Sequence, residues 1–180
     1  MNIDGIPTRT VRAHPAQNCI DIIDQTRLPH AVHWLRVATL EEAAHAIRAM
    51  RVRGAPLIGA TAAYGLAIAL KFEASDTRLG DAVARLRSTR PTAVNLHWAL
   101  ARMESVLRPL PPAARHRAAW QEAQAIADED AAQNAAIGQH GLALWRDLIV
   151  ADGGTLNVMT HCNAGWLATV DRGTALAPVY

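Results

Sequence analysis

The sequence contains few cysteines and no long apolar run. Cys19 and Cys162 are its two cysteines, and they stand too far apart to indicate a disulfide framework or a zinc site. The longest apolar stretch, residues 55–70, is shorter than the roughly 20 residues that span a bilayer. Residues 1–12 lack the apolar core of a secretory signal. We therefore expect a cytoplasmic protein in a reducing compartment, without a metal site and without membrane contact.

The sequence also has little excess of either sign of charge. The 18 lysines and arginines against 16 aspartates and glutamates give a net charge of +2. No basic run concentrates this charge, so we expect no nucleic-acid partner. Only Lys71 is a lysine, and every other basic residue is an arginine. Arginine favours bidentate recognition of phosphate or carboxylate, but a base composition that also favours alanine explains the same excess. The arginine content alone therefore assigns no function.

Aromatic residues make up only 4% of the chain, whereas hydrophobic residues make up 51%. Alanine, leucine, isoleucine and valine must therefore build the core. A chain of 180 residues is long enough to bury about 70% of the surface that it exposes when unfolded. This composition excludes a disordered protein. It fits one globular domain, or one domain and a fragment of a second.

Turn and capping signals predict a small β element followed by helices. Two short strands are expected at residues 19–23 and 31–35. Thr39 and Glu42 form a capping box, which begins the first helix. The predicted helices cover residues 39–54, 56–72, 76–87 with Asp76 as the cap, 91–107 opened by Pro91, and a long segment from Pro112 that is interrupted at Gly138 and Gly141. Because the second helix is apolar around nearly its whole circumference, we expect it to be central.

The character of the sequence changes after residues 152–154 (DGG). Residues 155–160 (TLNVMT) predict a strand, and residues 161–165 (HCNAG) predict a turn before another apolar segment. This order is typical of the first strand, loop and helix of a parallel α/β domain. We therefore predict an α/β protein in two parts. Residues 1–150 form a β element with a helical bundle, and residues 151–180 form the truncated start of a parallel α/β domain.

Two arginines stand beside predicted helix starts, where free backbone N–H groups and the helix dipole favour an anion. Arg53 precedes Gly54 and Pro56, and Gly54 would let the backbone approach a ligand closely. Arg90 precedes Pro91. We expect both helix starts at one cleft, where the two arginines share an anionic ligand. An arginine beside a helix-opening proline is also common in a solvated turn, and this alternative stays open for each.

Cys162 lies between the predicted strand and the predicted helix that follows it. In open α/β sheets this edge binds ligands, and a helix N-terminus stabilises a thiolate. We therefore expect a functional thiol that is more reactive than Cys19, with an inert buried cysteine as the alternative. The neighbouring His161 does not complete a Cys-His hydrolase, because adjacent residues near a strand end usually point to opposite sides.

Four segments carry a resemblance to a known family. They are residues 24–29 (DQTRLP), 52–59 (VRGAPLIG), 90–96 (RPTAVNL) and 160–165 (THCNAG). In this order and spacing they closely resemble the methylthioribose-1-phosphate isomerase family of methionine salvage. The same fold family includes ribose-1,5-bisphosphate isomerase and the regulatory subunits of the translation-initiation nucleotide exchange factor. The resemblance covers essentially the whole chain.

The resemblance implies an aldose-ketose isomerase that converts 5-methylthioribose 1-phosphate into 5-methylthioribulose 1-phosphate without a metal or an organic cofactor. It implies that Cys162 handles a proton together with an aspartate from a later segment. It also implies that Arg53, Gly54, Ala55 and Arg90 contact this small phosphorylated sugar.

The chain departs from this family in length and at two positions. Family members are much longer, and their further segments complete a Rossmann-like domain and supply the aspartate. Trp166 stands where we expect a small residue, and Arg172 where an aromatic residue is usual. The resemblance implies a homodimer or a C-terminal companion chain as partner, and we expect little activity from the chain alone. The alternative is a non-catalytic interaction module, similar to the regulatory relatives.

Overall fold

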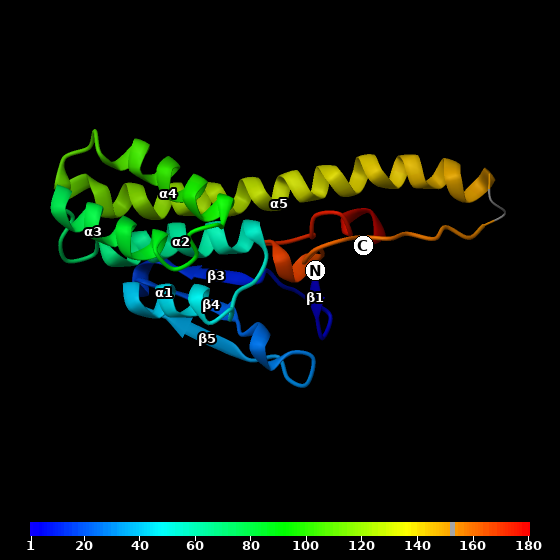
Figure 1. The fold of residues 1–180 in the computed structure, drawn as a ribbon, viewed down its shortest axis with the longest axis horizontal. Coiled ribbons are helices and arrows are strands. Elements are labelled where there is room, and N and C mark those ends of the chain that lie inside the picture. The colour runs from blue at the N-terminus through cyan, green and yellow to red at the C-terminus, as the bar shows by residue number, and fades with distance from the viewer. Residues whose placement is uncertain (152–153) are drawn as a thin grey trace.

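The structure is a computed structural model that describes residues 1–151 and 154–180. In these residues the strands and α-helices are β1 (Asn2–Ile3), β2 (Ile6–Pro7), β3 (Val11–His14), β4 (Cys19–Ile23), β5 (Trp34–Val37), α1 (Leu40–Arg48), α2 (Ala55–Ala69), α3 (Asp76–Arg87), α4 (Val94–Leu107) and α5 (Pro112–Ala151). The described chain is therefore mostly helical, with small antiparallel sheets (Figure 1).

The predicted β element is confirmed. β1 pairs with β2, and β3, β4 and β5 form an antiparallel sheet with β4 in the middle. Ile20 and Ile22 of β4 have no exposed surface and belong to the core, whereas Asp21 between them bonds Arg36 of β5 at 2.9 Å. This alternation is typical of a strand with one buried face. β5 begins at Trp34, later than predicted.

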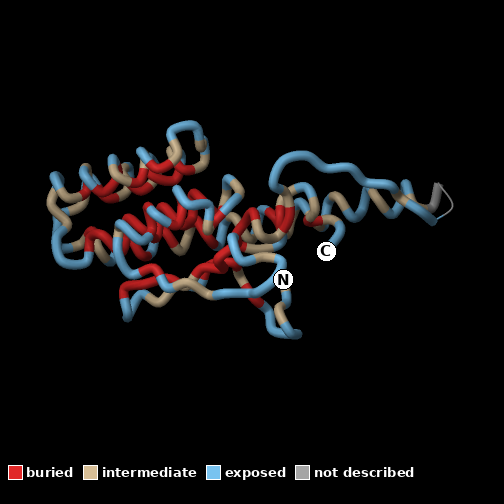
Figure 2. The backbone as a smooth tube through the Cα atoms, turned by 60° about the horizontal axis from the view of Figure 1, so that its bottom comes forward, coloured by how far each residue is buried: buried red, intermediate tan, exposed pale blue. Residues whose placement is uncertain are grey.

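Helix α2 is central, as predicted. Its residues 57–69 are all buried, and it contacts β3 and the helices α1, α3, α4 and α5. At Gly65 a Cβ would lie only 2.7 Å from the Cβ of Ala43 in α1, so this glycine permits close helix packing. The helix ends at Ala69, before Phe72, whose side chain is 92% exposed. The buried segments gather around α2 (Figure 2).

Helix α1 begins as predicted and ends earlier. The Thr39 and Glu42 side chains each accept the other residue's backbone N–H, at 3.1 and 3.0 Å, which completes the capping box. The helix ends at Arg48 and not near Gly54, because Met50 turns the chain with a φ of 54°. The segment that follows is a loop, and it carries the first of the two predicted arginines.

The starts of α3 and α4 also differ from the prediction. Ser75 caps α3, in place of Asp76, because its hydroxyl oxygen accepts a backbone N–H of the first turn. Helix α4 begins at Val94 and not at Pro91, because residues 90–93 form a hydrogen-bonded turn. For α4, proline therefore marked the correct region but not the first helical residue.

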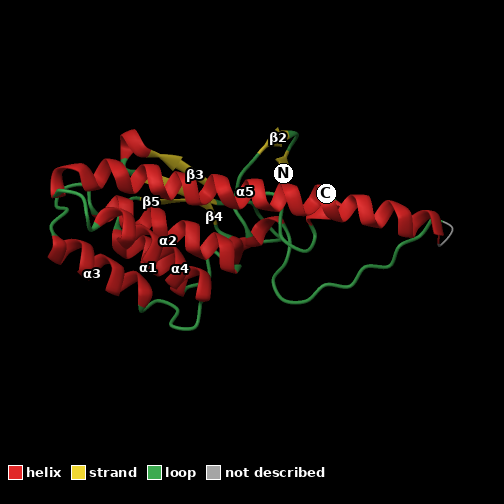
Figure 3. Cartoon of the chain, turned by 90° about the horizontal axis from the view of Figure 1, so that it is seen from above, coloured by secondary structure: helices red, strands yellow, loops and turns green. Residues whose placement is uncertain are grey.

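Helix α5 runs without interruption, so the breaks predicted at Gly138 and Gly141 are wrong. The two glycines instead make room for the C-terminal residues. A Cβ at Gly138 would lie 3.0 Å from the carbonyl oxygen of Ala177, and one at Gly141 would lie 2.3 Å from Cγ of Pro178. The outer part of α5 projects beyond the other helices (Figures 1 and 3). Within the described ranges, none of the helices combines the length and apolarity that crossing a membrane requires.

The strand predicted at residues 155–160 is wrong for this structure. These residues carry no strand and lie in a mostly exposed loop, which returns from the outer end of α5 (Figures 1 and 3). A parallel strand needs neighbouring strands for its backbone hydrogen bonds. In the described part of the chain, β1 to β5 pair only with one another. The α/β class therefore holds only as a mixed fold of helices and small sheets.

The chain returns to the core after residue 165. Thr169 and Val170 have no exposed surface. The Thr10 hydroxyl donates to the Thr169 carbonyl at 2.6 Å, and the Thr10 N–H donates to the Val170 carbonyl at 3.0 Å. From α5 the Asp130 carboxylate accepts the Val170 N–H at 2.7 Å, and burial raises the pKa of this carboxyl. Part of the predicted second segment thus packs against the first, and the division at residue 150 stays a prediction.

Candidate functional site

The candidate site lies at the N-terminus of α2. Arg53 is exposed in the preceding loop, Gly54 is the N-cap, and Ala55 is the first helical residue. No side chain caps this end of the helix. Its first backbone N–H groups therefore keep their capacity to bind an anion, and the helix dipole favours one there. The structure places the predicted binding residues Arg53, Gly54 and Ala55 at this helix start.

Gly54 has a structural role that the sequence did not reveal. We expected this glycine to let the backbone approach a ligand, but a Cβ at Gly54 would lie 2.4 Å from the backbone of Ala168. The chain itself occupies that space. A Cβ at Gly173 would likewise lie 2.1 Å from the carbonyl carbon of Gly165. Both glycines have positive φ values, and together they allow the returning chain to pack closely at the start of α2.

A cavity of about 380 Å³ opens beside Arg53. Three of the four segments that carry the family resemblance contribute to it. Its lining consists of Gln25, Leu28, Pro29, Arg53, Asn163, Ala164, Gly165, Trp166, Leu167 and Tyr180. Segments from both ends of the sequence therefore meet at the loop before α2.

Gln25 joins these segments by two hydrogen bonds. Its backbone N–H donates to the carbonyl oxygen of Arg51 at 2.9 Å, and its side-chain Nε2 donates to the carbonyl oxygen of Leu167 at 2.6 Å. The residue is only 8% exposed. Gln25 is not among the site residues predicted from the sequence, although the motif at residues 24–29 contains it. That motif was the only signal by which it could have been found.

The neighbouring Asp24 also bonds the loop before α2. One carboxylate oxygen accepts the backbone N–H of Thr26 at 3.1 Å and its hydroxyl at 2.6 Å, and the other accepts Arg51 Nη1 at 3.0 Å. Burial alone would raise the pKa of Asp24, but the hydrogen bonds from Thr26 and the charge of Arg51 outweigh burial and hold the pKa below its ordinary value. The ionised form is therefore the one that the fold stabilises.

Replacing Asp24 with asparagine is expected to lower the free energy of unfolding by about 1–3 kcal/mol at pH 7. Since the folded-state pKa is lowered, the contribution of the charge is present above the unfolded-state pKa and is lost as the pH falls through the folded-state pKa. Urea unfolding of wild type and Asp24→Asn at pH 7 and at pH 3 measures this. The difference should shrink at acidic pH, and the exposed Asp81→Asn serves as the control. An equal difference at both pH values would contradict the assignment.

Cys162 does not have the setting that the sequence predicted. It is exposed, with a φ of 66°, in a loop before the short 3-10 turn Trp166–Ala168. It therefore stands neither at the end of a strand nor at the start of an α-helix in this structure. Its neighbour Asn163 lines the cavity beside Arg53, whereas Cys162 itself is not part of that lining. The loop that bears the thiol thus reaches the candidate site.

Iodoacetamide is expected to label Cys162 at least about tenfold faster than Cys19 at neutral pH, because labelling of a buried thiol requires local opening of the fold. Cys162 is exposed, whereas Cys19 is 2% exposed. Peptide mapping by mass spectrometry gives both rates, and labelling in urea provides the control in which they should converge. Equal or slower labelling of Cys162 in the folded chain would be inconsistent with its exposed position.

Arg90 lies in the turn before α4 and is half-buried. The other buried or half-buried arginines of the described chain all donate to a protein oxygen. They are Arg9, Arg51, Arg78, Arg85, Arg87, Arg102 and Arg115. Among the described residues Arg90 has no such acceptor. A partly desolvated guanidinium without a partner favours an anionic ligand. That Arg90 and Arg53 share one anion stays a prediction.

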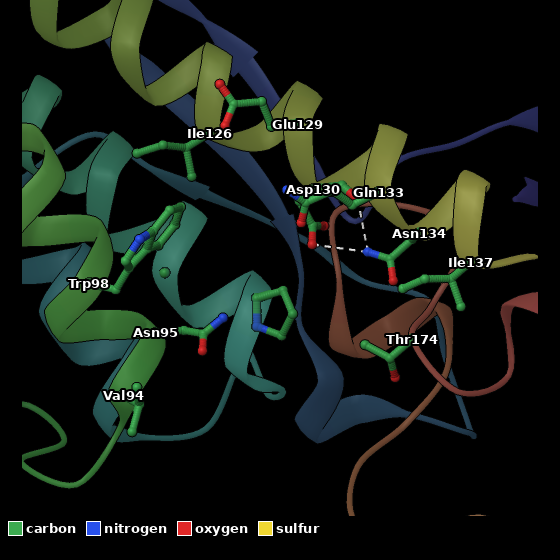
Figure 4. A pocket seen from close by; sticks show the side chains of 12 residues that line it. Val94, Asn95, Trp98, Ile126, Glu129, Asp130, Gln133, Asn134, Ile137 and Thr174 are labelled. Atoms are coloured by element: carbon green, nitrogen blue, oxygen red, sulfur yellow. Dashed lines mark hydrogen bonds between the residues drawn. The ribbon is translucent and has the colours of Figure 1, made fainter.

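A second cavity, of about 440 Å³, lies between the first turns of α2 and α4 and the middle of α5 (Figure 4). Asp130 and Asn134 of α5 lie side by side in it, with Asn134 Nδ2 donating to Asp130 Oδ1 at 3.0 Å. Glu129 adds a second carboxylate to the lining, and no arginine or lysine belongs to it. This cavity therefore suits a phosphate poorly, and none of the predicted site residues lines it.

Known proteins are similar to this chain over most or all of its length. The initiation factor 2 subunit family matches residues 51–177. The chain is 83% identical over all 180 residues to a methylthioribose-1-phosphate isomerase from Dechloromonas aromatica, and 56% identical to one from Methylorubrum populi. It spans 50% and 49% of these two proteins. It is also 53% identical over 177 residues to an uncharacterized protein in the petC 3' region of Rhodospirillum rubrum, of which it spans 96%.

Two solved structures have a similar fold, and their sequences are 34% and 36% identical to this chain. The structure matches translation initiation factor eIF-2B subunit delta from A. fulgidus with a TM-score of 0.79 at 34% identity, over 96% of this chain and 50% of that one. It matches 5-methylthioribose 1-phosphate isomerase from Pyrococcus horikoshii with a TM-score of 0.79 at 36% identity, over 96% of this chain and 48% of that one.

Proposed function

Because the chain belongs to the initiation factor 2 subunit family, we propose that it forms the substrate-binding part of a methylthioribose-1-phosphate isomerase of methionine salvage. The observation that carries the proposal is the meeting of Arg53, in the loop just before α2, and residues 163–167 at one cavity. The 83% identity to an isomerase along the whole chain supports it. The proposed reaction uses neither a metal nor an organic cofactor.

In this proposal the phosphate of 5-methylthioribose 1-phosphate binds at the start of α2. Arg53 and Arg90 donate to its oxygens, and the backbone of Gly54 and Ala55 contributes N–H groups. A helix N-terminus and an arginine side chain each stabilise a phosphate by charge and by directed hydrogen bonds. The uncapped end of α2 and the unpartnered Arg90 support this assignment.

Cys162 handles a proton in the conversion of the aldose to the ketose. Moving a proton between adjacent carbons requires one group that removes it and one that returns it. The proposed second group is an aspartate that does not belong to these 180 residues. The approach of the 163–167 loop to Arg53 supports this role, because it brings the neighbourhood of the thiol to the phosphate site.

We also propose that residues 151–180 belong to the start of a Rossmann-like domain. A homodimer partner or a C-terminal companion chain would supply the further strands, and the complex would act in the cytoplasm. The support is that residues 155–160 have a strand-like sequence but no strand partner among the described residues.

A non-catalytic interaction module is the second candidate function. The structure matches a translation initiation subunit and an isomerase with the same TM-score of 0.79, so the fold alone does not separate the two. A sugar-phosphate site does separate them, because a module that acts only through protein contacts does not need one.

Calorimetric titration of the chain with 5-methylthioribose 1-phosphate tests the proposal. We expect saturable binding at one site. Arg53→Ala and Arg90→Ala should each raise the dissociation constant by about ten- to hundredfold, as expected for the loss of hydrogen bonds to a charged group. The exposed Arg117→Ala is the control and should bind like wild type. Absence of binding by the wild-type chain would favour the interaction module.

A further inference from the structure

The loop that carries Cys162 has a single hydrogen bond to the first 150 residues of the described chain. Residues 161–168 otherwise bond with one another and with the following Thr169, apart from a long contact of 3.4 Å between the Trp166 N–H and the Tyr180 hydroxyl. The one connection is the bond from Gln25 Nε2 to the carbonyl oxygen of Leu167, at 2.6 Å. Within the described residues, Gln25 is therefore the polar side chain of the body that bonds residues 161–168, whereas Thr10 and Asp130 bond Thr169 and Val170, which follow this loop.

The same residue is fixed to the loop of Arg53. The Gln25 N–H donates to the Arg51 carbonyl at 2.9 Å, and the adjacent Asp24 carboxylate binds the Arg51 guanidinium at 3.0 Å. Main chain and side chain of Gln25 thus bond the two loops that meet at the cavity. Because the residue is only 8% exposed, water does not readily replace either bond.

We propose that Gln25 is a positioning residue of the candidate site, which holds the loop of Cys162 and Asn163 beside Arg53 so that one ligand can contact both. Its Nε2 is already bonded to Leu167, so it acts through the loop and not on the reacting atoms. The identity of the ligand rests on the proposed function, whereas the positioning itself rests on the bonds described above.

The packing of Ala168 against Gly54 also holds the returning chain. Dispersion and apolar burial fix the closeness of two segments but are not directional, whereas a hydrogen bond requires alignment of donor and acceptor. Loss of the Gln25 bond should therefore loosen the orientation of the loop without releasing it from the body. A local effect is expected, and global unfolding is not.

The test replaces Gln25 with methionine, which has a similar length but no N–H donor. Tyr64→Phe is the matched control, because it removes another buried side-chain bond, from the Tyr64 hydroxyl to Gln124 at 3.0 Å, outside the lining of this cavity. Three quantities are measured on the full chain. They are the melting temperature, the hydrogen exchange of the Ala168 and Thr169 amides, and the dissociation constant for 5-methylthioribose 1-phosphate.

Both variants should lose similar thermal stability. Only Gln25→Met should speed the exchange of the Ala168 and Thr169 amides, by at least about fivefold, and raise the dissociation constant by about five- to tenfold, as one lost hydrogen bond allows. Unchanged exchange in Gln25→Met would overturn the proposal. Faster exchange with an unchanged dissociation constant would overturn its link to ligand binding. If wild type binds no sugar phosphate, the proposed function fails, and exchange alone decides whether Gln25 positions the loop.

Discussion

Replacing Gly54 with alanine is expected to lower the free energy of unfolding by about 2–5 kcal/mol, the sum of backbone strain and overpacking. A Cβ at this position would lie 2.4 Å from both the Cα and the carbonyl oxygen of Ala168, and the φ of 91° is one that L side chains rarely adopt. The two contributions have different origins and therefore add. Chemical denaturation of the purified chain measures the loss.

Two other glycines separate strain from overpacking. Gly5 has a φ of 78° with no atom within 4 Å of an added Cβ, so Gly5→Ala should cost only the strain, about 1–2 kcal/mol. Gly80 in α3 has an equally open position without positive φ, and Gly80→Ala should raise stability by about 0.5–1 kcal/mol. If Gly54→Ala costs no more than Gly5→Ala, the returning chain does not pack against α2 as described.

Replacing Cys162 with serine is expected to lower turnover by about 10²–10⁴-fold in a complex that contains the remainder of the isomerase, since proton transfer by a positioned group contributes on that scale. Binding of the sugar phosphate should change little, because Arg53 and Arg90 are intact. Steady-state kinetics of the co-expressed complex, with 5-methylthioribose 1-phosphate as substrate, separates the two effects.

Cys19→Ser is the control for that experiment. Cys19 is buried in β4, and its thiol lies 3.8 Å from the Gln17 side chain. This variant should keep the turnover of the wild-type complex. Equal losses in Cys162→Ser and Cys19→Ser would remove the reason for assigning chemistry to Cys162.

Local signals predicted the parts of the fold that depend on neighbours in the sequence. The capping box at Thr39 and Glu42 forms as expected, and the apolar run of α2 is buried on all sides. The predictions from local sequence failed where contacts between residues far apart in the chain determine the structure. Gly138 does not break α5, because the helix is regular there and the glycine only makes room for Ala177. A strand-like sequence at residues 155–160 forms no strand without neighbouring strands in the described residues.

The candidate site was likewise predicted only where it depends on local sequence. A helix start with an arginine before it can be recognised from sequence, and Arg53 lies at one. The hydrogen bond beside that helix start could not be predicted from the sequence, because its donor Gln25 and its acceptor Leu167 stand 142 positions apart. No periodicity or spacing links such residues, and of the two only Gln25 belongs to a segment that carries the family resemblance. The close approach of Ala168 to Gly54 was likewise invisible, because a glycine in sequence does not reveal what occupies the space beside it.

The central claim is that these 180 residues bind the sugar phosphate but need a further polypeptide for turnover. The most direct test is conversion of 5-methylthioribose 1-phosphate by the chain alone and by the chain co-expressed with the part of the D. aromatica isomerase that it does not match, with gel filtration to verify that the two associate. We predict negligible turnover by the chain alone and clear turnover by the complex. Full turnover by the chain alone, or none by an associated complex, would contradict the account.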